Sequence, residues 1–250
     1  MVSTNRVGSP PAFGTDSPPC PPRALPRAPS PAADHRGRVG EAEQSERGGG
    51  GGGGAEGRSE PSQGSHVGRT EIRVGGLGGQ GVILCGSIIG KAAAIYSGRH
   101  AALIQAFGPE ARGSACSAQV IVADEAIGYP YVRRPDILVL LSQDAFVQFS
   151  PQLKPDGVVL YENELVQVEG RLPTTARSFG IPATRFAEEL GRRLVLNIVM
   201  AGFFTGVTNL LSIDAVEKAV VDSVPKGTES LNLKALMKGY EYGRGLITPA

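Results

Sequence analysis

Residues 71–94 read EIRVGGLGGQGVILCGSIIGKAAA, and this stretch decides the fold. A short β-type run, Glu71–Val74, is followed by a glycine-rich turn and then by the apolar run Val82–Ala94, which only Ser87 and Lys91 interrupt. That order predicts a strand, a tight turn and a buried helix. Glycines in such a turn permit positive φ angles, and the first amides of the helix attract anions.

The rest of the chain continues this alternation. Pro135–Leu141 is an unbroken apolar run, which is typical of a parallel strand buried on both faces. Ser142 and Ser212 stand where helix N-caps are expected. The other expected elements are strands at 101–104, 118–122 and 158–161 and a helix at 184–190. We predict an α/β fold: one domain with a mostly parallel sheet flanked by helices, Rossmann-like in type.

Residues 194–213 contain no charged side chain and are long enough to span a bilayer. We expect a helix buried in the core or at a subunit interface instead, because polar residues interrupt the run: Asn197, Thr205, Thr208 and Asn209. We interpret Asn197 as a buried amide with satisfied hydrogen bonds. The last helix is expected to bury the face that carries Leu233, Leu236, Met237 and Tyr240.

Residues 1–68 differ in composition from the rest. They hold 14 of the 35 glycines and 10 of the 19 prolines, including the glycine run 48–54, and few large apolar side chains. We interpret residues 1–68 as a disordered leader and residues 69–250 as the folded domain. The leader has no apolar core typical of a secretory signal, and a true translation start near Val67 stays open as an alternative.

Charge and cysteine content exclude several function classes. The net charge of +1 gives no electrostatic basis for binding nucleic acid or an anionic membrane. Cys20, Cys85 and Cys116 are far apart and form no CxxC pair, so neither a disulfide framework nor a zinc or iron–sulfur site is indicated. We expect no metal site and a reducing, cytoplasmic location.

The turn also fits the dinucleotide fingerprint, with Gly76, Gly78 and Gly81 in a GxGxxG pattern. An NAD site needs an acidic residue about twenty positions later for the ribose hydroxyls, and none occurs between Val82 and Pro109. An NAD(P)-dependent dehydrogenase is therefore a disfavoured alternative from a different class. Another alternative is a structural scaffold, in which the glycine turn packs against its neighbours and binds no ligand.

A second motif follows the strand at 101–104. Gln105–Ser114 reads QAFGPEARGS, a loop at the carboxyl end of a strand, where open α/β sheets place their ligands. Glu110 and Arg112 bring opposite charges into it. They are either an exposed ion pair or part of an anion clamp or subunit contact.

Three motifs together carry a family resemblance: Gly78-Gly-Gln-Gly81, Phe107-Gly-Pro-Glu-x-Arg-Gly113 and Val224-Pro-Lys-Gly-Thr-Glu229. Over essentially residues 70–245 the chain resembles the gamma subunit of 2-oxoacid:ferredoxin oxidoreductases. Residues 127–130 and 231–234 look most like the 2-oxoglutarate branch, 2-oxoglutarate synthase. The same role in a pyruvate or branched-chain 2-oxo acid enzyme stays open.

The resemblance implies a subunit of an enzyme that decarboxylates a 2-oxo acid on thiamine diphosphate, passes electrons through iron–sulfur clusters to ferredoxin and forms an acyl-CoA, or runs in reverse. The expected partners are alpha and beta subunits, with delta in four-subunit forms. Asp156-Gly157 follows Pro155 and so lacks the Gly-Asp-Gly of a thiamine motif. We therefore expect this chain to hold no redox cofactor, to be inactive alone and to contain no catalytic residue.

By the same resemblance, the glycine turn and the second loop are assigned to the neighbourhood of coenzyme A or to subunit packing. The ten candidate residues are Gly76, Gly78, Gly79, Gln80, Gly81, Gly108, Pro109, Glu110, Arg112 and Gly113.

Overall fold

The computed structural model describes residues 68–108, 115–168, 170 and 172–247. The predicted disordered leader, apart from Gly68, lies outside the described residues. So do four candidate site residues of the second loop: Pro109, Glu110, Arg112 and Gly113.

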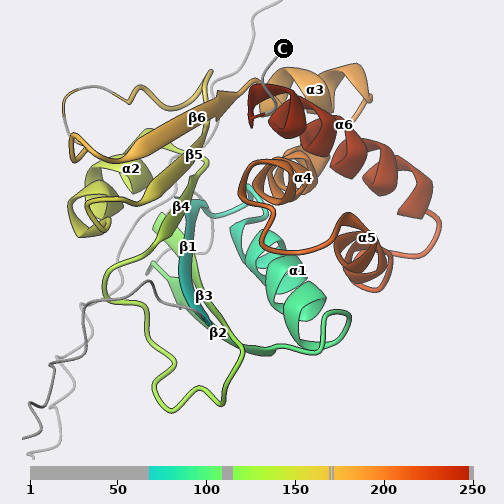
Figure 1. The fold of residues 1–250 in the computed structure, drawn as a ribbon. Helices are drawn as coiled ribbons and strands as arrows, with labels where there is room; N and C mark the ends of the chain where they lie inside the picture. Colours follow the sequence, from blue (N-terminus) through green and yellow to red (C-terminus); the bar gives the residue numbers. More distant parts are fainter. Residues whose placement is uncertain (1–67, 109–114, 169, 171, 248–250) are drawn as a thin grey trace, which may run out of the picture. The chain divides into compact units, whose positions relative to one another are not determined.

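Six strands form one sheet in the order β2-β3-β1-β4-β5-β6 (Figure 1). Their bounds are β1 Arg69–Leu77, β2 His100–Phe107, β3 Ala115–Ala123, β4 Ile137–Leu140, β5 Val158–Glu162 and β6 Arg177–Ile181. The pairs β1–β4, β4–β5 and β5–β6 are parallel, whereas β3 is antiparallel to both β1 and β2. Five strands therefore run in one direction, which confirms a mostly parallel sheet with β3 as the exception.

The direction of β3 follows from the length of its connection. Only residues 108–114 separate β2 from β3, and a parallel crossover needs a dozen or more residues. The two strands therefore form a hairpin, and β3 pairs between β2 and β1. In consequence β2, the second strand of the first βαβ unit, is not the sheet neighbour of β1.

Helices cover both faces of the sheet. On one face lie α1, α3, α4, α5 and α6, and on the other lies α2 (Figure 1). Their bounds are α1 Val82–Ala94, α2 Gln143–Phe149, α3 Ala183–Glu189, α4 Leu196–Thr208, α5 Ile213–Val221 and α6 Glu229–Ile247, with 3-10 turns at Ser150–Gln152 and Arg193–Val195. Both expected caps are present, since Ser142 Oγ accepts from Ala145 N and Ser212 Oγ accepts from Ala215 N, each at 3.3 Å.

Both apolar runs of the sequence are buried in the structure, as predicted. All four residues of β4 are buried, as expected for a parallel strand covered on both faces. α4 is also buried from Leu196 to Gly206, which leaves only its last two residues partly exposed. The larger core lies beneath α1, α4, α5 and α6, and a smaller one lies between the sheet and α2, around Phe146 and Phe149.

The contact between α4 and α6 depends on glycines. A Cβ atom at Gly202 would lie 2.0 Å from the carbonyl oxygen of Leu236, and one at Gly239 would lie 2.0 Å from that of Val199. The same holds one helical turn further along. A Cβ atom at Gly206 would lie 2.4 Å from Tyr240 O, and one at Gly243 would lie 3.0 Å from Phe203 O. The backbones of the two helices therefore touch directly.

This contact corrects the expected face of the last helix. The buried residues of α6 are Asn232, Ala235, Leu236, Gly239 and Gly243. Of the four large side chains expected to form its buried face, only Leu236 is fully buried. The small residues face α4 because they alone allow such close approach.

Candidate functional site

The glycine turn and Gly108, the first residue after β2, lie at the same end of the sheet. The turn follows β1, whose last residue Leu77 pairs with Ala115 of β3. Phe107, the last residue of β2, pairs with Cys116, and the amide of Gly108 donates to Ala115 O at 2.9 Å. The first residues of β3 therefore lie between the end of β1, where the glycine turn follows, and the end of β2, where Gly108 follows.

Gln80 fixes the turn to the sheet with both ends of its side-chain amide. Its Oε1 accepts from the amide of Leu77 at 2.6 Å, and its Nε2 donates to Leu141 O, just beyond β4, at 2.8 Å. A Cβ at Gly76 would lie 2.7 Å from Gln80 Oε1, so Gly76 leaves room for this side chain. The turn is thus held between the carboxyl ends of β1 and β4.

Replacement of Gln80 tests this connection. Gln80→Ala is expected to lower the free energy of unfolding by about 1–3 kcal/mol, because Leu77 N and Leu141 O both lose their partner. Gln80→Glu is the matched control, since it keeps the acceptor for Leu77 N but cannot donate to Leu141 O when ionised. Urea denaturation of the two variants measures the loss, and an alanine variant as stable as wild type would contradict it.

Gly81 connects the turn to α1 and also contacts α4. It has φ +74°, in the left-handed region, and a Cβ there would lie 2.4 Å from Asn197 Nδ2. Asn197 is 2% exposed, and its Nδ2 donates to Gly81 O at 3.3 Å. Its Oδ1 is buried without a partner among the described residues, so the expectation of a fully satisfied amide is wrong for that atom.

The chemistry of this edge is that of backbone amides. The first turn of α1 carries no acidic side chain, so the positive end of the helix is not neutralised there. The described candidates Gly76, Gly78, Gly79, Gln80, Gly81 and Gly108 include no titratable group. Such a site attracts an anionic or polar group and orients it, but these residues supply no proton transfer and no nucleophile.

The two described cysteines do not fit an iron–sulfur cluster. Burial raises the pKa of the Cys85 thiol to about 12 and also raises the pKa of Cys116. Cluster ligands are thiolates in closely grouped sets, and a raised pKa keeps the thiol protonated. Within the described ranges, no group of three or more His, Cys, Asp or Glu side chains is placed to hold a metal ion.

Burial of Cys85 has a measurable consequence. With a pKa of about 12, on the order of one thiol in 10,000 is ionised at pH 8, so the folded protein is expected to leave Cys85 unmodified by iodoacetamide. Mass spectrometry of its peptide, with and without denaturant, measures this. Extensive modification of Cys85 under native conditions would show that α1 opens.

The family model described as pyruvate ferredoxin/flavodoxin oxidoreductase matches residues 71–242. The chain belongs to this family. It is therefore a subunit of an oxidoreductase, which confirms the resemblance drawn from the three motifs.

Individual relatives agree with this membership. The chain is 48% identical to 2-oxoglutarate synthase subunit KorC of Methanocaldococcus jannaschii, over 71% of this chain and 96% of the relative. It is 31% identical to ketoisovalerate oxidoreductase subunit VorA of Methanothermobacter thermautotrophicus, over 69% of this chain but 36% of the relative. The crystal structure of a keto/oxoacid ferredoxin oxidoreductase gamma subunit from Geobacter sulfurreducens has TM-score 0.61 and 37% identity, covering 70% of this chain and 99% of that one. The chain is thus of the gamma-subunit type of 2-oxoacid:ferredoxin oxidoreductases.

No helix within the described ranges is long and apolar enough to cross a membrane. The uncharged segment 194–213 contains the 13-residue helix α4, which packs against α6 in the core. Its interpretation as a buried helix is confirmed.

Proposed function

We propose that this chain is the gamma subunit of a ferredoxin-dependent 2-oxoglutarate oxidoreductase of the cytoplasm. The assembled enzyme converts 2-oxoglutarate and coenzyme A to succinyl-CoA and CO2, and it passes the two electrons to ferredoxin; the reverse reaction uses the same steps. The observation that carries this proposal is the 48% identity to a 2-oxoglutarate synthase subunit over 96% of that subunit's length.

In this proposal the chain completes a site whose redox chemistry resides in other subunits. Thiamine diphosphate and the iron–sulfur clusters belong to the alpha and beta subunits, and to delta where it occurs. Two properties of the chain support this division: the protonated, buried thiol of Cys85 and the absence of titratable groups among the described candidate residues. We assign no catalytic residue to this chain.

We further propose that the glycine turn lies beside coenzyme A in the assembled enzyme. The support is chemical. Free amides at the first turn of a 13-residue helix favour an anionic group, and Gln80 holds the turn in one position. The residues Pro109, Glu110, Arg112 and Gly113 of the second loop lie outside the described residues, and their assignment to the same neighbourhood or to a subunit contact stays a prediction.

Two alternatives to this proposal stay open: a different 2-oxo acid as the substrate of the assembled enzyme, and a different class of enzyme. The same role in a pyruvate or branched-chain enzyme differs only in the 2-oxo acid. An NAD(P)-dependent dehydrogenase fits less well, because the acidic residue for the ribose is missing and β3 separates β1 from β2.

Co-expression with the alpha and beta subunits tests the proposal. We expect a stable complex that reduces methyl viologen only when both coenzyme A and a 2-oxo acid are present, with the largest kcat/KM for 2-oxoglutarate. A larger value for pyruvate or 2-oxoisovalerate would move the chain to another branch. NAD-dependent turnover by the isolated chain would contradict the proposal altogether.

A further inference from the structure

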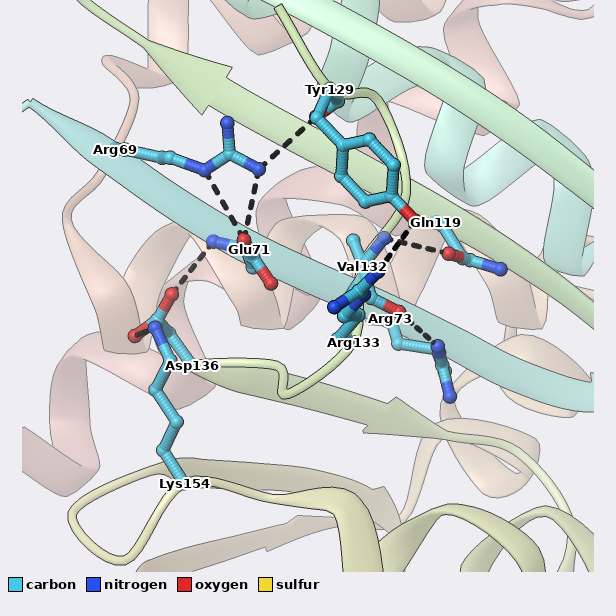
Figure 2. Close-up of polar contacts among 9 residues, drawn as sticks. All are labelled: Arg69, Glu71, Arg73, Gln119, Tyr129, Val132, Arg133, Asp136 and Lys154. Carbon is cyan, nitrogen blue, oxygen red and sulfur yellow. Dashed lines mark hydrogen bonds and ion pairs between the residues drawn. The ribbon is translucent and has the colours of Figure 1, made fainter. Parts of the chain in front are cut away.

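The segment between β3 and β4, residues 124–136, lies on the face of the sheet opposite α1. Ile72 and Val74 of β1 point into the core beneath α1, so Arg73 between them points to the other face. There the Arg73 guanidinium lies 4.9 Å from the ring centre of Phe149, and its Nη2 donates to Val132 O at 2.6 Å. Figure 2 shows the hydrogen bond between Arg73 and Val132.

Several hydrogen bonds hold this segment in one conformation. Val132 N donates to Gln119 Oε1 at 2.8 Å, and Arg69 Nη2 donates to Tyr129 O at 3.2 Å (Figure 2). At its end, the Asp136 carboxylate accepts from Glu71 N at 2.8 Å and from Lys154 Nζ at 2.7 Å. These contacts reach both ends and the middle of residues 129–136, so they hold the backbone of this stretch in one conformation.

Four exposed side chains of this segment form what we call the Tyr–Arg surface: Tyr129, Tyr131, Arg133 and Arg134. Tyr129 and Tyr131 are 47% and 51% exposed, and their ring centres lie 5.5 Å apart. The Arg133 guanidinium lies 5.2 Å from the ring centre of Tyr129. Tyrosine and arginine are the residue types most enriched in the energetically dominant parts of protein interfaces.

The described carboxylates near this surface do not neutralise the positive charge of its two arginines. Nearby carboxylates are already paired: Glu71 with Arg69, Asp124 with Arg99 and Asp136 with Lys154. Among the described residues, no carboxylate forms an ion pair with Arg133 or Arg134. Of the three acidic residues in segment 124–136, Asp124 and Asp136 have cation partners and Glu125 has none among the described residues. The Arg133 guanidinium therefore lies exposed beside the Tyr129 ring, and Arg134 is a second exposed cation next to it in the chain.

We propose that the Tyr–Arg surface docks another subunit of the same oxidoreductase through carboxylates on that subunit. The inference rests on the proposed function, since it needs an assembled enzyme. The surface calls for an acidic protein partner because arginine pairs carboxylates with two parallel hydrogen bonds. The chain also matches only 36% of the VorA relative, so there the same domain belongs to a longer chain with further protein attached. A backbone that is already held in one conformation loses little conformational entropy on binding, which favours a lasting contact.

The experiment measures binding of the full chain to the purified alpha–beta complex. Arg133→Glu/Arg134→Glu is expected to weaken binding about 100-fold at about 50 mM salt, and the difference from wild type is expected to shrink at about 500 mM. Arg192→Glu/Lys234→Glu, two exposed sites elsewhere, makes the same change in net charge and is expected to bind like wild type. Tyr131→Ala is expected to weaken binding at both salt concentrations, since its contact is mainly apolar.

The outcomes separate this inference from the proposed function. If the wild-type chain does not bind the alpha–beta complex, both are overturned. If it binds and the charge reversal has no more effect than the control, the docking surface alone is overturned. A dimer of the isolated chain that the reversal dissociates would assign the surface to a second copy and would also overturn the proposal. Thermal denaturation of each variant checks that the exposed substitutions leave the fold intact.

Discussion

Gly202→Ala is expected to lower the free energy of unfolding by about 3 kcal/mol or more. The new methyl group would lie 2.0 Å from the Leu236 carbonyl oxygen, which is backbone and cannot rotate away. The two helices would have to separate, and the side chains packed around them would lose contacts. Gly239→Ala is expected to have a similar effect, because it meets Val199 O at the same distance.

Gly245→Ala is the matched control for this prediction. Gly245 lies in the same helix α6, but no atom stands within 4 Å of a Cβ built there. Alanine is the better helix former by about 1 kcal/mol, so this variant is expected to be as stable as wild type or more stable. Urea denaturation of the three variants decides the matter. Equal stability of the Gly202 and Gly245 variants would show that the α4–α6 contact is looser than described.

Gly81→Ala is expected to have the largest effect on function. Its left-handed φ of +74° costs a residue with a Cβ about 1–2 kcal/mol, and the methyl group would also collide with Asn197. The turn must then shift relative to α1 and α4. We propose above that the turn lies beside coenzyme A, and on that proposal kcat/KM for coenzyme A in the assembled enzyme should fall about 100-fold, because a shift of about 1 Å in a binding element has effects of this size.

Two comparisons isolate the cause. Gly79→Ala also places alanine at a positive φ, +99°, but into open space, so it is expected to lose much less. Adding Asn197→Ala to Gly81→Ala removes the two closest contacts, with Nδ2 and Cγ, and leaves only the Cβ of residue 197 at 2.9 Å, so it should recover part of the loss. If the Gly79 and Gly81 variants are equally impaired, backbone strain alone explains the effect and the contact with Asn197 does not.

Local pattern predicted α1, β4 and two helix caps, but it ended two strands too early. Residues 75–77 belong to β1 and residues 105–107 to β2, whereas the sequence placed them in the glycine turn and the second loop. α1 has the predicted bounds, Val82–Ala94, because its apolar run and preceding glycine turn leave few other conformations. β4 is buried on both faces, as its unbroken apolar run indicated. Ser142 and Ser212 cap their helices, since capping depends on the few residues next to the cap.

Features that depend on distant contacts were not predicted. The place of β3 between β1 and β2 is a matter of pairing, and the pattern of 118–122 does not distinguish a central antiparallel strand from a parallel one. The buried face of α6 was assigned from its large apolar residues. It is instead set by Gly239 and Gly243, whose importance arises only from the glycines opposite them in α4.

The site shows the same division. The glycine turn was predicted because five glycines fall within residues 75–81, and Gly108 because it follows a strand. The glycine turn and Gly108 both lie next to Ala115 because of the register of β3, and this register could not be predicted from the sequence. Asn197 was read as a buried amide, and only the structure brings it against Gly81, 116 positions earlier in the chain.

Omission of this chain from the reconstituted enzyme is the most direct measurement of its role. The alpha and beta subunits are assayed for 2-oxoglutarate- and coenzyme A-dependent viologen reduction, first alone and then with stoichiometric amounts of the chain. We predict little turnover without the chain, full turnover with it, and no activity or bound redox cofactor in the chain alone. Full activity without the chain, or a flavin, thiamine or iron cofactor retained by the chain alone, would contradict the account.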